Sequence, residues 1–322
     1  MDTLTLLLIV VFGTQQAITI GVAAQGELMT EKSGIINIGI EGVMLISAFT
    51  AAAANWYFGA PDSPVPKALM MGSASPWGAL AVGMATGVLL NFFVAVMDTK
   101  LRVDQVISGI GINVFGLGLT YLISANPGLD RHYGFSLDGT PHANQLSSLF
   151  SVKGTYLSVG ISPLVILLFG LPVLVWAVLK WTKFGLHVRA VGENPKSAEA
   201  AGLNVNMVRI LATSIGGALL GLGGAYLTVD FAPNFTPDVT NGIGFIALAA
   251  VIAGAWNPFY TLVVSLIFGM SVGTYVVINA TPGTPLFTFL AVLPYLVTVV
   301  ALTITAKRLR QPSALGVPYK KE

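Results

Sequence analysis

A single ionisable side chain lies well inside an apolar run of this sequence: Glu41, in GIINIGIEGVMLIS. A carboxylate in a lipid-embedded segment is costly, so such a residue is a functional candidate by default. Asn37 precedes it by four residues, and on a helix this spacing puts both side chains on one face. The pair could contact a solute, or it could clamp one span to a neighbour, and the sequence leaves both interpretations open.

Three more side chains in apolar runs complete a candidate solute path: Phe12, Gln16 and Asn113. The two amides could hydrogen-bond a neutral polar solute, and an aromatic ring offers a face for stacking. Polar side chains at this depth more often hold helices together, and aromatic ones more often pack or face lipid.

The remaining acids argue against a proton-coupled carrier. Asp98, Asp104 and Asp230 all fall at the ends of apolar runs, so no series of buried acids is expected beside Glu41. A carrier driven by an ion gradient needs such ionisable or ion-binding groups.

Enzymatic and metal-site patterns are missing from the sequence. It contains no G-x-x-x-x-G-K-[ST], no H-E-x-x-H and no cysteine. His132, His142 and His187 are too scattered to suggest a metal site. We therefore expect no catalytic residue, no metal and no bound cofactor on this chain.

The composition indicates a polytopic helical membrane protein. Of 322 residues, 54% are hydrophobic and 9% charged, and the mean hydropathy is +0.79. Soluble domains carry about 25% charged residues. The apolar runs are continuous for about 20 residues and lack the alternation of barrel strands, so the predicted class is all-α.

We expect about nine transmembrane helices, within a range of eight to ten. They cover residues 4–24, 34–57, 77–97, 104–125, 157–180, 207–229, 243–256, 259–280 and 286–306. The seventh is short for ~30 Å of hydrocarbon and could be half of a broken helix. Gly83 with Gly87, and Gly217 with Gly221, have the four-residue spacing that lets helices approach closely in lipid.

The basic residues predict an orientation. If residues 25–33, 98–103, 181–206 and the C-terminal tail are cytoplasmic, 13 of the 16 Lys and Arg residues lie in or beside cytoplasmic segments, and only Lys67, Arg131 and Lys153 do not. Basic loops near spans stay cytoplasmic. The prediction is therefore an outer N-terminus and a cytoplasmic C-terminus.

A long basic polar interval between apolar runs, residues 181–206, predicts a short helix on the cytoplasmic face. Asn194 is a suitable N-cap, Pro195 suits a first helical position, and Gly202 can end the helix. A helix with this composition needs a protein partner rather than lipid.

Four stretches together resemble one family. They are EKSGIINIGIEGVMLISAF, VDQVISGIGINVFGLGLTYL, KFGLHVRAVGENPKSAEAAGLNV and GFIALAAVIAGAWNP, and they occur in the family's order. They are similar to permease subunits of bacterial ABC importers, in the superfamily of branched-chain amino acid and ribose permeases. The first stretch resembles most the branch that works with basic-membrane-protein-type lipoproteins on nucleosides and simple sugars.

The resemblance implies one permease domain over residues 1–322, with a type II-like importer fold, in the bacterial plasma membrane. It implies a coupling helix that docks on a separate ATPase, which would hold the ATP and Mg²⁺. The residues that would make this contact are Arg189, Glu193, Asn194, Pro195, Lys196, Glu199 and Gly202.

Further partners are also implied by the resemblance: a second permease chain, identical or different, an extracytoplasmic binding lipoprotein, and the bilayer, but no nucleic acid. The implied solute is a nucleoside. A simple sugar such as ribose or galactose remains open, as does, in another class, an ion-coupled secondary transporter.

Overall fold

A computed structural model describes residues 3–59, 70–71, 74–124, 150–153, 158–231, 235–280, 292–305 and 311–319. In these ranges the chain is mostly helical, as predicted, with one small antiparallel hairpin. The helices are α1 (Thr3–Glu31), α2 (Ile40–Gly59), α3 (Ser75–Val96), α4 (Gln105–Ser124), α6 (Val165–Trp181), α7 (Lys183–Glu193), α8 (Pro195–Ala200), α9 (Val205–Tyr226), α10 (Ile243–Ala253), α11 (Pro258–Asn279) and α12 (Leu293–Thr305).

Each of the nine expected spans coincides with a helix, but a count of nine membrane crossings is not confirmed. Within the described ranges, five helices are long and apolar enough to cross a membrane, or six if α6 and α7, which meet at 79°, form one span. The helix α10 has 11 residues, about 16 Å at ~1.5 Å per residue, which is too short to cross alone. Its expected break from α11 at Asn257 is present, and the Asn257 side chain accepts a hydrogen bond from the Phe259 amide at 3.0 Å.

Several expected boundaries are wrong. Residues 25–31, expected in a polar turn, continue α1, and residues 97–101 continue α3 as a π-helical turn, η3 (Met97–Leu101). A second π-helical turn, η4 (Leu227–Phe231), extends α9. The start of the fifth expected span is instead strand β2 (Ser158–Ile161), which pairs with β1 (Phe150–Lys153). The sequence between 126 and 149 lies outside the described residues.

The two glycine pairs face each other, in the kind of close helix approach that their spacing predicted. A Cβ atom added at Gly87 would lie 2.1 Å from the carbonyl oxygen of Gly217, and one at Gly221 would lie 2.2 Å from that of Gly83. The backbones of α3 and α9 are therefore in direct contact. Such close packing replaces the hydrophobic drive that is absent between helices in lipid.

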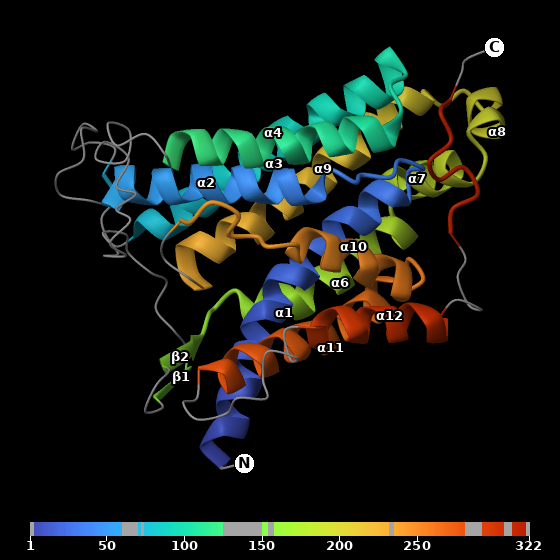
Figure 1. Ribbon diagram of the computed structural model, residues 1–322. Helices are drawn as coiled ribbons and strands as arrows, with labels where there is room; N and C mark the ends of the chain where they lie inside the picture. Colours follow the sequence, from blue (N-terminus) through green and yellow to red (C-terminus); the bar gives the residue numbers. More distant parts are fainter. Residues whose placement is uncertain are drawn as a thin grey trace.

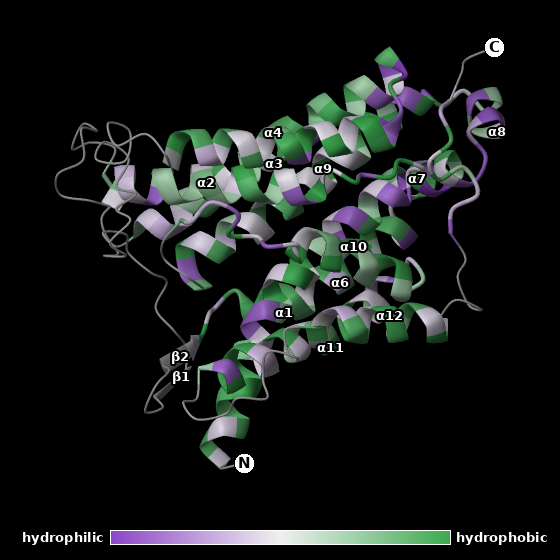
Figure 2. Cartoon of the chain, viewed as in Figure 1, coloured by the Kyte–Doolittle hydropathy of each residue, from purple (hydrophilic) through white to green (hydrophobic). Residues whose placement is uncertain are grey.

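Among the described residues, hydrophilic side chains are concentrated at one end of the molecule (Figure 2). Figure 1 shows α7, α8 and the C-terminal segment together at one end, and the β1–β2 hairpin lies well away from them. Most helices between are apolar along their length, whereas hydrophilic residues are concentrated around α7 and α8 (Figure 2). The helices α1 and α9 are largely buried, while α4 is largely exposed.

Candidate functional site

Glu41 lies in the first turn of α2 and binds the beginning of α10. Its carboxylate accepts hydrogen bonds from the amides of Gly242 at 2.8 Å and Gly244 at 2.7 Å. The first amides of a helix have no partner within it, and a negative charge there is favourable. A Cβ atom added at Gly244 would lie 2.6 Å from the carboxylate, so the small residue admits the contact. Glu41 thus clamps two helices together.

Asn113 performs a similar task for α2. Its side-chain oxygen accepts from the Gly42 amide at 2.7 Å, and its nitrogen donates to the Ile38 carbonyl at 2.9 Å. It fixes the start of α2 against α4. Both groups of this amide are therefore engaged with backbone.

A groove of about 240 Å³ opens beside these two residues. Its walls come from α2, α4 and the segment that leads into α10, and they include Glu41, Asn113, Asp238 and Phe245. Asp238 and Phe245 are exposed. The lining of the groove is almost entirely apolar, and the Phe245 ring contributes to it. Neither Asp238 nor Phe245 was singled out from the sequence as a candidate path residue.

The other predicted path residues do not line this groove. Asn37 is not helical, since α2 begins only at Ile40, so the expected shared helix face with Glu41 is wrong. Asn37 is fully buried and donates from its side chain to Asn91 at 3.3 Å. Gln16 is buried within α1, and the ring of Phe12 contacts that of Phe231 edge-on at 5.0 Å.

Sequence analysis missed five buried ionisable residues. Glu27 is 0% exposed, Glu31 2%, Asp98 4%, Asp230 9% and Arg209 2%. Two had been placed in a cytoplasmic turn and the others at span ends. The expectation that Glu41 is alone among buried acids is wrong, and the argument against ion coupling cannot rest on it.

The predicted short helix is present as α8, and each of its end signals acts as expected. The Asn194 side chain accepts from the Ser197 amide at 3.0 Å, and Pro195 occupies the first helical position. Gly202 ends the turn with φ of +88°. The preceding helix α7 was not predicted. Thr182 caps it by accepting from the Gly185 amide at 3.0 Å.

Most residues expected to meet an ATPase are accessible on this face. Arg189, Glu193, Asn194, Lys196 and Gly202 are exposed. Pro195 and Glu199 are half-buried. The α7–α8 face is therefore open to a protein partner.

The C-terminal segment, residues 311–319, lies across this face and is called the C-terminal strap below. The Ser313 hydroxyl donates to Glu193 at 2.8 Å, and the Ala314 amide donates to the Gly192 carbonyl at 2.9 Å. The Gly316 amide donates to the Gly34 carbonyl at 3.1 Å, and the Tyr319 hydroxyl donates to Glu199. The strap thereby joins α7, α8 and the turn after α1.

Arg209, at the start of α9, anchors the strap from below. Its Nη1 donates to the Val317 carbonyl at 3.1 Å and its Nε to the Ser33 carbonyl at 3.2 Å. A single buried guanidinium thus holds both the strap and the α1–α2 turn.

Replacing Arg209 with Ala is expected to release the strap. Each hydrogen bond from a charged donor contributes about 1.5–3 kcal/mol, so the strap should open at least tenfold more often. Limited proteolysis of the purified chain, followed by mass spectrometry, would then show faster cleavage within residues 311–319. Lys183→Ala, at an exposed residue of the same face, is the control, and equal cleavage of both variants would contradict the assignment.

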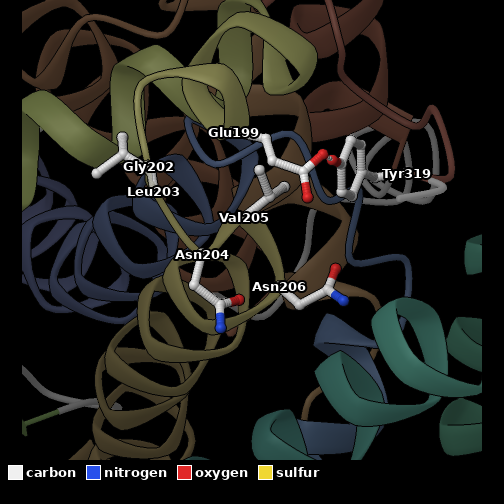
Figure 3. A pocket seen from close by; sticks show the side chains of 7 residues that line it. All are labelled: Glu199, Gly202, Leu203, Asn204, Val205, Asn206 and Tyr319. Atoms are coloured by element: carbon white, nitrogen blue, oxygen red, sulfur yellow. Dashed lines mark hydrogen bonds between the residues drawn. The ribbon is translucent and has the colours of Figure 1, made fainter. Parts of the chain in front are cut away.

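A pocket of about 370 Å³ lies between α8, the start of α9 and the strap. Figure 3 shows the side chains that line it. The Glu199 and Tyr319 side chains point toward one another at its upper edge, and Asn204 and Asn206 lie below them (Figure 3). The Asn204 side chain caps α9 by accepting from the Met207 amide at 3.1 Å. The strap therefore supplies one wall of this pocket.

Comparison with known proteins gives consistent matches. Residues 9–304 match the family described as branched-chain amino acid transport system, permease component. The guanosine ABC transporter permease protein NupQ of Bacillus subtilis (strain 168) is 34% identical, over 100% of this chain and 99% of that protein. The nucleoside ABC transporter permease protein NupC of Lactococcus lactis subsp. cremoris (strain MG1363) is 33% identical, over 92% and 91%.

A second nucleoside ABC transporter permease protein of that Lactococcus lactis strain, NupB, is 26% identical over 74% of this chain and 64% of its own length. No solved structure matches this chain.

Proposed function

The chain belongs to the branched-chain amino acid transport system permease family, and from this premise we propose that it is the permease subunit of an ATP-driven importer for nucleosides. The observation that carries the proposal is the likeness along the whole chain to two nucleoside permeases. A permease subunit of this kind changes no covalent bond in the solute, so the chain is a transport component and not an enzyme.

The groove beside Glu41 is our proposed part of the solute path. A nucleoside combines hydroxyl donors with a flat ring, and the groove has an almost entirely apolar lining that includes the exposed Phe245 ring, with Asp238 among its lining residues. Stacking and hydrogen bonding are the interactions that such a solute requires. Glu41 and Asn113 serve here as the residues that hold the groove open.

Uptake of radiolabelled nucleosides into cells that co-express the partner subunits tests this function. Excess unlabelled ribose, galactose and leucine run alongside as competitors. We expect nucleoside uptake that the sugars and leucine leave intact. If ribose or galactose suppressed the uptake and leucine did not, the solute of this permease would be a simple sugar. That result would contradict the proposal.

We assign the other components of the transporter to separate chains. A separate ATPase would hold ATP and Mg²⁺ and dock on α8 through the exposed residues of the α7–α8 face. A second permease chain completes the membrane pathway, and the two different nucleoside permeases of one Lactococcus lactis strain support a heterodimer. A binding lipoprotein delivers the solute at the outer face, and the N-terminus lies outside with the C-terminus in the cytoplasm.

ATPase docking on α8 predicts a specific crosslink. Because the sequence has no cysteine, an introduced one is unique. Ala200 is exposed and Ala198 is 4% exposed. In the assembled complex we expect Ala200→Cys to crosslink to the ATPase chain and the buried Ala198→Cys to react little. Absence of any ATPase adduct from Ala200→Cys would refute docking at α8.

A further inference from the structure

The bend between α6 and α7 lies at a surface of the bilayer. The helix α6 has 17 residues, about 26 Å at ~1.5 Å per residue, which is close to the ~30 Å of hydrocarbon that a span must cross. Ile166, Phe169 and Leu174 along it are exposed, as lipid-facing side chains are. The two helices meet at 79°. The helix α7 therefore leaves the end of α6 nearly parallel to the membrane plane.

Thr182 fixes this bend. Its hydroxyl donates to the Val178 carbonyl at 2.6 Å and accepts from the Gly185 amide at 3.0 Å. A Cβ atom added at Gly185 would lie 2.1 Å from the same carbonyl oxygen, so the start of α7 packs closely on the end of α6. Lys180 and Lys183 flank the bend. Their Cα atoms are at most about 11 Å apart, since consecutive Cα atoms are ~3.8 Å apart.

Aromatic rings surround the first of these lysines. The ring centre of Trp176 lies 4.7 Å from that of Trp181 and 6.0 Å from that of Phe259, at the start of α11. The Lys180 ammonium lies 4.8 Å from the Trp176 ring centre, a cation–π distance. Trp181 is 71% exposed, and exposed tryptophans are typical of the level at which a helix leaves the hydrocarbon. We call Trp176, Lys180, Trp181, Lys183 and Phe259 the elbow patch.

The elbow patch has positive charge and no compensating acid. Lys180 and Lys183 are both exposed. Residues 176–186 and the first turn of α11 contain no Asp or Glu, and within the described ranges neither lysine forms an ion pair. Each ammonium group has three hydrogen-bond donors, and phosphate oxygens are strong acceptors for them. The patch is therefore suited to an anion that also has an apolar part.

We propose that the elbow patch binds the headgroup of an anionic phospholipid from the adjoining leaflet. The phosphate would contact the two ammonium groups, and the acyl chains would lie along the exposed apolar side chains of α6. The rings and this apolar helix surface favour a phospholipid over a soluble anion, which would use the lysines alone. The site goes beyond the proposed function, because it assumes nothing about the solute or the ATPase.

Native mass spectrometry of the full chain in detergent, titrated with phosphatidylglycerol or phosphatidylcholine, tests the proposal. We expect phosphatidylglycerol to bind more tightly. Lys180→Gln and Lys183→Gln should each weaken its binding about fivefold, the effect of one basic residue near an anionic membrane surface. Binding of phosphatidylcholine should stay the same. Glycerol 3-phosphate, which has the anion without acyl chains, should not displace the lipid, and efficient displacement would overturn the proposal.

Lys100→Gln is the matched control. Lys100 is also an exposed lysine at the end of a long apolar helix, in η3 after α3. Among the described residues, no aromatic ring lies against it. Its substitution should leave phosphatidylglycerol binding unchanged. Equal losses from Lys100→Gln and Lys180→Gln would indicate general attraction between basic residues and acidic lipid, and would overturn the proposal.

A protein partner is the alternative occupant of the elbow patch, because α7 leads to the proposed ATPase contact on α8. Association of the purified chain with its ATPase in lipid-free detergent separates the two. The double variant Lys180→Gln with Lys183→Gln should associate as the unmodified chain does. Weaker association, together with unchanged phosphatidylglycerol binding, would assign the patch to the ATPase and contradict the lipid site, while the proposed transport function would stand.

Discussion

Gly87→Leu is expected to abolish accumulation of folded protein. A Cβ at this position would lie 2.1 Å from the Gly217 carbonyl oxygen and 2.7 Å from the Gly221 Cα. Backbone atoms cannot rotate away as a side chain can, so α3 and α9 would have to separate along their contact. Overpacking typically lowers the folding stability by about 1–3 kcal/mol. Because this clash is with backbone atoms, we expect a loss at or above the upper end of that range.

The control is the same substitution at Gly118 of α4. A Cβ there would meet nothing within 4 Å, and the residue is exposed. Fluorescence-detected size-exclusion chromatography of both variants after heating compares their stability. Gly118→Leu should match the unmodified chain, and a Gly87→Leu variant that is equally stable would contradict the close α3–α9 contact.

The second large effect is expected for Glu41→Ala, which removes the clamp between α2 and α10. The amides of Gly242 and Gly244 lose their acceptor, and hydrogen bonds to a charged group contribute about 1.5–3 kcal/mol each. The start of α10 forms one wall of the groove. We therefore expect nucleoside uptake to fall at least tenfold.

Kinetics distinguish a clamp from a solute ligand. Loss of the clamp reduces the number of working transporters and lowers the maximal rate, whereas loss of a solute contact raises the KM. Glu41→Gln should be intermediate, because one amide oxygen can accept from only part of the pair. A variant Glu41→Ala with normal maximal rate and a much raised KM would show that Glu41 binds solute instead.

Features that depend on local chemistry were predictable from the sequence. The Asn194 cap, the Pro195 start and the Gly202 end of α8 involve neighbouring residues, and all three are where the pattern placed them. The glycine pairs of α3 and α9 follow from a four-residue spacing within each helix. The break between α10 and α11 follows from Asn257 and Pro258.

Features that depend on distant contacts were not predictable. Residues 25–31 look like a polar turn, yet they continue α1, because Trp256 hydrogen-bonds Glu31 and the Asn37 amide donates to Glu27 at 3.2 Å. The strap depends on pairs separated by 120 residues, such as Ser313 and Glu193, and Arg209 reaches Ser33 across 176 residues. No window of the sequence contains both members of these pairs.

The buried acids also change the reason for preferring an ATP-driven importer. The sequence analysis argued against ion coupling because buried acids seemed scarce. Since Glu27, Glu31 and Asp98 are buried, that argument no longer holds. Membership in the permease family now carries the preference. The absence of a P-loop from the sequence agrees with a nucleotide site on another chain.

Guanosine uptake into proteoliposomes that contain this chain, its ATPase, the second permease and the binding lipoprotein tests the central claim most directly. ATP on the ATPase side should drive accumulation, vanadate should stop it, and an ionophore that collapses ion gradients should leave it unchanged. Accumulation that persists without ATP and disappears with the ionophore would contradict the account and identify an ion-coupled transporter.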